Sequence, residues 1–173
     1  MNKKTIYIID TSAILSGKII DLENEKIVTV HNIKQEINPP GNDYIQFQLL
    51  IEKGLVFNQP SKSSIERIEE ESKKTGDFER ISKIDTEILA LALEYKNEGI
   101  YTPVILTDDY SIQNMANFLN IKFISISQKG ITKRFKWIYR CQGCGKKFKD
   151  NIKICPICGS ELKKKLNRRD NLR

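Results

Sequence analysis

The sequence predicts an α/β protein in which a parallel sheet is sandwiched by helices, followed by a small C-terminal module. Short apolar runs alternate with helical segments over the first 128 residues of the 173-residue chain. All four cysteines lie within residues 141–158. The net charge also changes sign between the two parts. About 130 residues suffice for one hydrophobic core, whereas the remaining segment is too short to fold without a metal.

Five short apolar runs are predicted to be strands, because each has the length of a strand and is bounded by polar or turn-forming residues. They cover residues 6–10, 27–30, 55–58, 103–107 and 121–125. Helical segments separate most of them. This alternation implies a parallel sheet that is covered on both faces.

Helical segments are predicted at residues 12–16, 32–37, 44–53, 65–74, 83–97 and 111–119. The clearest is 83–97, where apolar residues such as Ile84 and Ile88 recur at helical spacing and Ser82 can cap the first turn. An Asn-Pro-Pro-Gly-Asn run at 38–42 ends the second segment, and Gly76 ends the fourth.

The cysteine spacing is C-x2-C-x10-C-x2-C, which is typical of a tetrathiolate zinc site. The four residues are Cys141, Cys144, Cys155 and Cys158. A glycine follows each pair and permits the tight turn that wraps two thiolates around a metal. Four protein ligands leave no open coordination position, so a single Zn²⁺ would be structural and catalysis must lie elsewhere.

Two disulfides or a redox pair are the alternative explanations of the cysteines. The apolar run at residues 6–9 is too short for a signal-peptide core or a membrane span, so nothing in the sequence suggests export. In a reducing compartment, paired C-x-x-C motifs are far more often metal ligands than disulfides.

Charge divides the chain at about the same place. Residues 129–173 carry 15 Lys and Arg against three acidic residues, a net charge of +12, whereas residues 1–128 have a net charge of −5. Such a concentration of positive charge indicates a polyanion partner. Basic residues interleave with aromatic ones, which favours an RNA surface, although the aromatics can equally pack the module's core and the last ten residues can be a solubilising tail. The predicted RNA-binding residues are Lys133, Arg134, Lys136, Trp137, Arg140, Lys146 and Lys147.

Acidic residues follow two of the predicted strands: Asp10 after the first, and Asp108 and Asp109 after the fourth. Ligands of parallel sheets bind beyond the carboxyl ends of the strands, so we expect these carboxylates to meet over one crevice, with Glu36 and Asp85 at or near helix starts. Crowded carboxylates raise one another's pKa unless a divalent cation is bound, and oxygen ligands suit Mg²⁺ or Mn²⁺. Such an ion lowers the pKa of a bound water and neutralises charge on a phosphate, which is the apparatus of phosphodiester hydrolysis.

Each acid also has a purely structural explanation. Asp85 can be the acidic partner of a capping box, and Asp108 or Asp109 can cap the next helix. Asp10 is harder to explain in this way, because a carboxylate directly after a buried strand needs a partner. The other catalytic machinery is sparse: His31 is the single histidine, and the sequence has no Gly-rich phosphate loop.

Four segments resemble the acidic motifs of PIN-domain ribonucleases, in the right order and at appropriate separations. They read IYIIDTSA, HNIKQEI, SKIDTEILALAL and VILTDDYSIQNMA and span about residues 5–126. An FKWIYRC strand then leads into the four-cysteine ribbon. This combination resembles the archaeal Nob-type endoribonucleases, which mature the 3′ end of small-subunit ribosomal RNA. Toxin-type PIN proteins end without the ribbon.

The resemblance implies a PIN-like nuclease domain at residues 1–128, a zinc ribbon with basic flanks at 129–163 and a basic tail at 164–173. It implies that four residues are catalytic and bind Mg²⁺ or Mn²⁺, namely Asp10, Glu36, Asp85 and Asp109. The T-x-D form of the last motif favours Asp109 over Asp108, which is left as an auxiliary. The ribbon would hold one structural Zn²⁺.

The resemblance further implies a single-stranded RNA substrate, namely precursor small-subunit (16S) rRNA, with the pre-30S particle and its assembly factors as partners. It implies cytoplasmic action and no membrane partner. Three alternatives remain at this point: a toxin-like or general PIN ribonuclease of other RNA specificity, a catalytically silent RNA- or ribosome-binding adaptor, and a domain that is phosphorylated on Asp10. The sequence disfavours the last, because Ser12 occupies the place of the second Asp in a haloacid-dehalogenase-type D-x-D motif.

Overall fold

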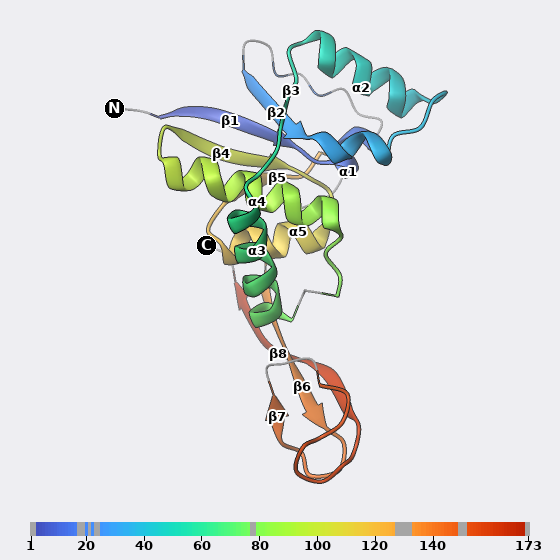
Figure 1. The fold of residues 1–173 in the computed structure, drawn as a ribbon, viewed down its shortest axis with the longest axis vertical. Helices are drawn as coiled ribbons and strands as arrows, with labels where there is room; N and C mark the ends of the chain where they lie inside the picture. The colour runs from blue at the N-terminus through green and yellow to red at the C-terminus, as the bar shows by residue number, and fades with distance from the viewer. Residues whose placement is uncertain are drawn as a thin grey trace.

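The computed structural model describes residues 3–16, 20, 22, 25–76, 79–126, 133–148 and 152–171. It confirms the predicted fold class, with a five-stranded parallel sheet and a separate three-stranded antiparallel sheet. In Figure 1 the larger α/β unit lies above, and the smaller sheet extends below it. Within this part of the chain, no helix combines the length and the apolar character needed to cross a membrane.

The parallel sheet has the strand order β3-β2-β1-β4-β5. Its strands are β1 (Lys4–Ile9), β2 (Lys26–Val30), β3 (Val56–Asn58), β4 (Tyr101–Leu106) and β5 (Lys122–Ile124). The central strand β1 pairs with both neighbours, so that Ile8 lies between Val28 and Ile105. Ile6, Ile8 and Ile9 are fully buried, as expected for a strand that is covered on both faces.

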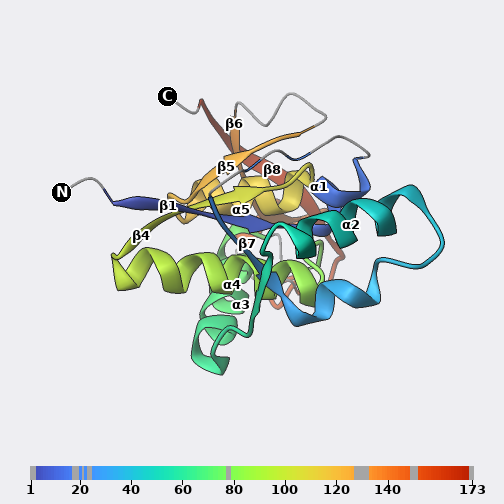
Figure 2. The same ribbon diagram turned by 90° about the horizontal axis from the view of Figure 1, so that it is seen from above.

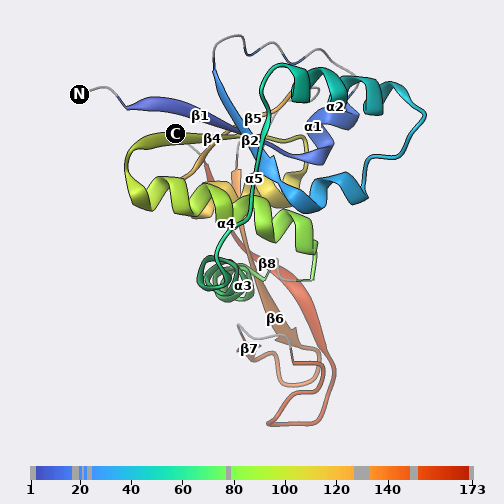
Figure 3. The same ribbon diagram turned by 45° about the horizontal axis from the view of Figure 1, so that its top comes forward.

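Helices cover both faces of this sheet. They are α1 (Thr11–Leu15), the 3₁₀ helix η1 (His31–Gln35), α2 (Asn42–Glu52), α3 (Lys62–Thr75), α4 (Lys83–Glu98) and α5 (Tyr110–Phe118). Helix α4 lies along the sheet and contacts β1, β2 and β4 on one side and α3 and α5 on others (Figure 2). Figure 3 shows α2 on the opposite side of the sheet from α3 and α4. Because α4 runs antiparallel to the strands, its N-terminus lies near their carboxyl ends.

The smaller unit is an antiparallel sheet of order β7-β6-β8, made of β6 (Lys133–Cys141), β7 (Lys147–Phe148) and β8 (Leu162–Asn171). Strand β8 pairs with β6 from Leu162 opposite Cys141 to Asn171 opposite Lys133, with one register shift between Lys136 and Trp137. The sequence-based boundary between ribbon and basic tail, after residue 163, therefore falls inside one strand. The Lys- and Arg-rich stretch has no alternating apolar pattern, and its strand conformation comes from pairing with β6.

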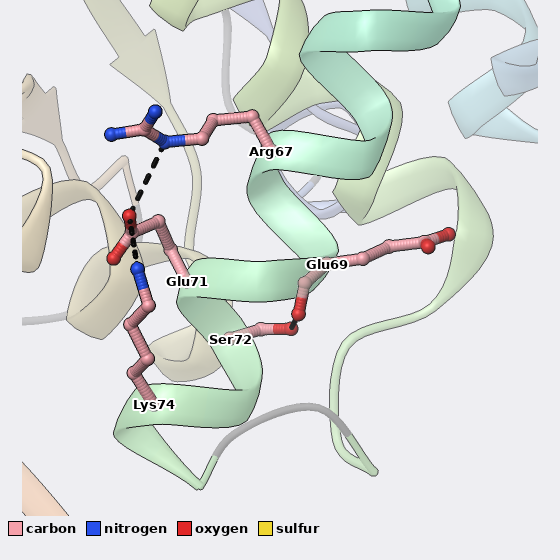
Figure 4. Close-up of polar contacts among 5 residues, drawn as sticks. All are labelled: Arg67, Glu69, Glu71, Ser72 and Lys74. Atoms are coloured by element: carbon pink, nitrogen blue, oxygen red, sulfur yellow. Dashed lines mark hydrogen bonds and ion pairs between the residues drawn. The ribbon is translucent and has the colours of Figure 1, made fainter.

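Helix α3 forms part of the junction between the two units. It ends at Gly76, which adopts a left-handed conformation with φ of +77°, and the ammonium group of Lys164 on β8 donates a hydrogen bond to the carbonyl of Gly76. On the same helix, the largely buried carboxylate of Glu71 lies between Arg67 and Lys74, with N to O distances of 3.2 and 2.9 Å (Figure 4). Strand β6 also contacts α3 and α5, so the ribbon packs on the α/β unit.

Candidate active site and metal centre

The four cysteine sulfur atoms form one cluster in which all lie within 4.8 Å of one another. Cys141 and Cys158 have their Sγ atoms 3.3 Å apart, and those of Cys144 and Cys155 are 3.7 Å apart. A tetrahedral Zn²⁺ with Zn–S bonds of about 2.3 Å requires S to S separations of about 3.8 Å. None of the four forms a disulfide. The donor set and its size therefore fit a structural zinc, as the spacing predicts.

The backbone of each C-x-x-C pair explains why the cluster forms locally. Gly145 and Gly159 both have φ of +72°, in the left-handed region that favours glycine. Each glycine N–H donates to the carbonyl of the first cysteine of its own pair, at 3.2 and 3.0 Å. The backbone N–H and the hydroxyl of Ser160 lower the pKa of the Cys158 thiol to about 6, whereas desolvation and the neighbouring cysteines raise the pKa of Cys144 to about 11. The four sulfurs therefore share their protons unevenly when no metal is bound.

Asp10 is the N-cap of α1, directly after β1, and is only 2% exposed. Its Oδ2 atom accepts hydrogen bonds from the hydroxyl groups of Ser12 (2.5 Å) and Thr107 (2.8 Å). Burial raises the pKa of Asp10 to about 6, and the nearby charge of Asp85 adds to this, although the hydrogen bonds oppose it. Sequence reasoning missed Ser12 and Thr107 as groups that orient Asp10; the D-T-S and T-x-D motifs contain the signal.

Asp85 lies in the first turn of α4 and forms a capping box with Ser82, at 2.8 Å from the Ser82 N–H to the carboxylate and 3.1 Å in the reciprocal bond. Burial raises the pKa of Asp85, and the neighbouring charges of Asp109 and Glu36 raise it further. The predicted capping box of Asp85 with Ser82 is therefore confirmed. The capping role does not exclude a role in the acidic site, because the same carboxylate caps α4 and lies near the other acids.

Asp109 caps α5 by accepting hydrogen bonds from the N–H groups of Ser111 (2.5 Å) and Ile112 (3.3 Å). Glu36 is exposed and lies at the C-cap of η1, rather than at or near a helix start as expected from the sequence. The prolines at 39–40 prevent the chain from continuing as a helix beyond it. Glu36 is thus presented from the end of a short 3₁₀ turn that follows β2.

Asp108, the immediate neighbour of Asp109, has a different environment. It is buried, and its Oδ1 atom accepts hydrogen bonds from the hydroxyl of Ser125 (2.6 Å) and the N–H of Ile126 (2.9 Å). These bonds tie the end of β4 to the segment after β5. The Asp108 N–H also donates to the Ser12 hydroxyl at 2.8 Å. The carboxylates of Asp108 and Asp109 therefore make separate sets of contacts.

The acids form an electrostatically coupled group rather than a tight chelate. Among the described residues, only the cysteines bring three or more metal-binding atoms within 4.8 Å of one another. Mg²⁺ commonly keeps several waters and is held by one or two carboxylates, so it does not require three carboxylates in close contact. Burial is the main cause of the raised pKa of Asp10 and Asp85, and neighbouring carboxylates add a smaller effect that a bound cation would relieve.

The predicted RNA-binding residues lie on or beside the ribbon sheet. Arg140 and Lys147 are exposed and directly opposite in the β6–β7 pair, and Arg140 is also opposite the exposed Lys163 of β8. These three cationic side chains therefore form a row across one face of the sheet. The sequence identifies Lys163 only as part of the basic C-terminal stretch, because the strand register alone places it beside Arg140. Lys146 is also exposed, whereas the side chains of the remaining four lie outside the part of the chain described: Lys133, Arg134, Lys136 and Trp137.

The parallel sheet, with acidic residues after its strands, and the four-cysteine cluster are the features expected of a PIN-type nuclease with a zinc-ribbon-like module. The family model for the PIN domain of ribonuclease matches residues 7–95. Endoribonuclease Nob1 of Archaeoglobus fulgidus is 36% identical over 156 residues, covering 90% of this chain and 88% of the relative. Endoribonuclease Nob1 of Pyrococcus abyssi is also 36% identical, over 163 residues, which cover 92% and 93% respectively. Ribonuclease VapC1 of Thermoplasma acidophilum is 38% identical over 167 residues, covering 96% and 81%.

The chain belongs to the PIN-domain ribonucleases, enzymes that hydrolyse phosphodiester bonds with the aid of a metal, and is related to the archaeal Nob1 proteins. Membership implies an RNA substrate. It also disfavours a catalytically silent adaptor and a phospho-accepting domain.

Proposed function

We propose that this protein is an endoribonuclease that cleaves precursor small-subunit (16S) rRNA, within the pre-30S particle in the cytoplasm, to form its mature 3′ end. The observation that carries the proposal is the joining of a coupled acidic site to a basic ribbon on one chain. The similarity to two endoribonucleases named Nob1 extends over about nine tenths of this chain and so includes both parts.

In this proposal the catalytic unit is residues 1–128, and its Mg²⁺ or Mn²⁺ is held by Asp10, Glu36, Asp85 and Asp109. A bound ion of this kind supplies a water of lowered pKa and neutralises charge on the scissile phosphate. Ser12 and Thr107 orient Asp10 through hydrogen bonds of 2.5 and 2.8 Å to its Oδ2 atom. Asp108 supports the crevice by joining two strand ends.

The basic segment 129–173, with one structural Zn²⁺, would grip the RNA. The strongest support for RNA binding by this segment is the row of Lys147, Arg140 and Lys163 across the ribbon sheet. Like charges directly opposite in a sheet are destabilising, so this arrangement costs stability in the free protein. A phosphate backbone lying across the row would convert that repulsion into attraction and release counterions.

An RNA that spans the 3′ end of precursor 16S rRNA tests the proposal directly. The purified chain should cut it at one position in Mn²⁺, whereas omission of the ion or Asp10→Asn should abolish the cut. Primer extension or sequencing of the products locates the cleavage site. Efficient cleavage by Asp10→Asn would refute the catalytic assignment.

A second candidate function is a PIN ribonuclease with another RNA target. The 38% identity to Ribonuclease VapC1 favours it, because this similarity covers 96% of the chain and so includes the ribbon that toxin-type PIN proteins are expected to lack. An equal mass of unrelated structured RNA added to the same reaction distinguishes the two. Preferential cutting of the competitor, or cuts scattered through the ribosomal RNA, would favour the second candidate.

A further inference from the structure

The element that presents Glu36 is intrinsically weak. Helix η1 is a five-residue 3₁₀ turn, and the residue at its N-cap, Val30, makes no side-chain capping bond. Short 3₁₀ turns have poorer hydrogen-bond geometry than α-helices and gain little stability of their own. Something outside η1 must therefore hold the direction in which Glu36 points.

A side-chain bond to α4 meets this need. The Nδ2 atom of Asn32 in η1 donates to both carboxylate oxygens of Glu87, at 2.8 and 2.9 Å. At the other end of the amide, Gln35 Nε2 donates to Asn32 Oδ1 at 3.0 Å. Asn32 is thus held both by its own turn and by the neighbouring helix.

Glu87 is an unusual residue to find in this place. It is 2% exposed, and among the described residues no cation pairs with it. A buried carboxylate whose donor is a neutral amide is costly, and an apolar residue would pack the helix more favourably. The carboxylate therefore has a purpose other than stability.

The position of the bond indicates that purpose. Glu87 lies two residues after Asp85 in α4, and Asn32 lies four residues before Glu36, so the bond joins the two elements that carry these acids. Asp85 lies in the first turn of α4, and Glu36 is the C-cap residue of η1. The alignment of η1 with the first turns of α4 thus determines where Glu36 stands relative to Asp85.

We propose that Asn32 and Glu87 are positioning residues of the active site: their bond, the Asn32–Glu87 clamp, orients η1 so that Glu36 faces Asp85 across the metal site. The inference rests on the metal-binding roles proposed above for Glu36 and Asp85. The clamp touches neither RNA nor the metal. Its whole effect on cleavage passes through Glu36.

The test is a double-mutant cycle between Asn32 and Glu36, read as RNA cleavage over a range of Mn²⁺ concentrations. Loss of a residue that orients a metal ligand costs about 10- to 100-fold in metal affinity or activity. Asn32→Ala should therefore reduce kcat/KM by about 10- to 100-fold and raise the Mn²⁺ concentration for half-maximal rate. In the Glu36→Ala background, the same change should have almost no further effect on rate.

Two further variants separate positioning from stability. The matched control is Asn58→Ala. It removes a different hydrogen bond from a side-chain amide to α4, the one from Asn58 Nδ2 to the Tyr95 hydroxyl at 2.5 Å. It should lower the melting temperature without changing the Mn²⁺ requirement. If Asn32→Ala does not fold, the pair Asn32→Leu and Glu87→Leu removes the bond without leaving a buried unpaired charge. It should fold and show the same loss of rate.

The outcomes separate the clamp from the proposed function. If Asn32→Ala reduces the cleavage rate by the same factor in the wild-type and the Glu36→Ala backgrounds, the clamp is refuted. The proposed metal-binding roles of the acids are not affected by that result. A raised Mn²⁺ requirement in Asn58→Ala would also refute the clamp. It would show that the loss of any hydrogen bond to α4 raises the Mn²⁺ requirement. Full activity of Glu36→Ala would refute the role of Glu36 and the clamp with it.

Discussion

Replacing Asp10 by Asn should stabilise the protein at neutral pH while abolishing cleavage. Asp10 is 2% exposed, and its pKa is raised from 3.8 to about 6, mainly by burial. At pH 7.5 the folded state therefore carries a charge that its surroundings disfavour. The oxygen of the Asn amide can accept the same bonds from Ser12 and Thr107, so the change removes the charge and keeps the contacts.

The size of the effect follows from the two pKa values. A carboxyl whose pKa is raised on folding binds protons more tightly in the folded state, so stability falls as pH rises from about 4 to about 6 and stays lower above that. Each pH unit in this window corresponds to about 1.4 kcal/mol, which gives a penalty of about 3 kcal/mol at pH 7.5 as an upper limit. At pH 5 about half of this penalty remains.

Urea unfolding of both proteins at pH 5 and pH 7.5, without added Mg²⁺ or Mn²⁺, measures this difference. Asp10→Asn should exceed wild type by up to about 3 kcal/mol at pH 7.5 and by about half as much at pH 5. The difference in the free energy of unfolding between the two proteins is taken at each pH. Contributions from the protonation of other groups, including the cysteines, then cancel. A variant that is less stable than wild type at pH 7.5, or a difference that does not change with pH, would refute the reasoning.

Three further changes test other parts of the molecule. Cys155→Ser should lower bound zinc, measured by elemental analysis, from one to near zero per chain; wild-type protein without zinc would contradict the ribbon assignment. Asp109→Asn should reduce cleavage by about 100-fold or more, whereas Asp108→Asn should cost only a few-fold, since an amide oxygen can still accept from Ser125 and Ile126; the reverse order would exchange the two roles. Removal of residues 129–173 should weaken RNA binding and, for about four lost phosphate contacts, flatten the salt dependence of log K by about 3; unchanged binding at every salt concentration would mean that the ribbon does not grip RNA.

Local patterns in the sequence were enough to predict the cysteine cluster and most of the fold. A C-x-x-C pair followed by glycine forms its turn from hydrogen bonds within one knuckle, such as that from Gly145 to Cys141. The strands and helices likewise follow from apolar spacing within windows of a few residues, as in α4 with its Ser82 cap. Asp10 and the pair Asp108 and Asp109 could be selected because they come just after strands of a parallel sheet, and such strands end at one edge. The choice of Asp109 over Asp108 came from the resemblance to the PIN-domain motifs.

The tertiary structure alone decided how neighbouring residues differ in their contacts. Asp108 and Asp109 are adjacent in the sequence, yet the first contacts the segment after β5 and the second lies near Asp85. The pairing of β8 with β6 and the bond from Asn32 to Glu87 join residues far apart along the chain. Such contacts depend on how strands and helices pack against one another, and no pattern within a short window carries that information.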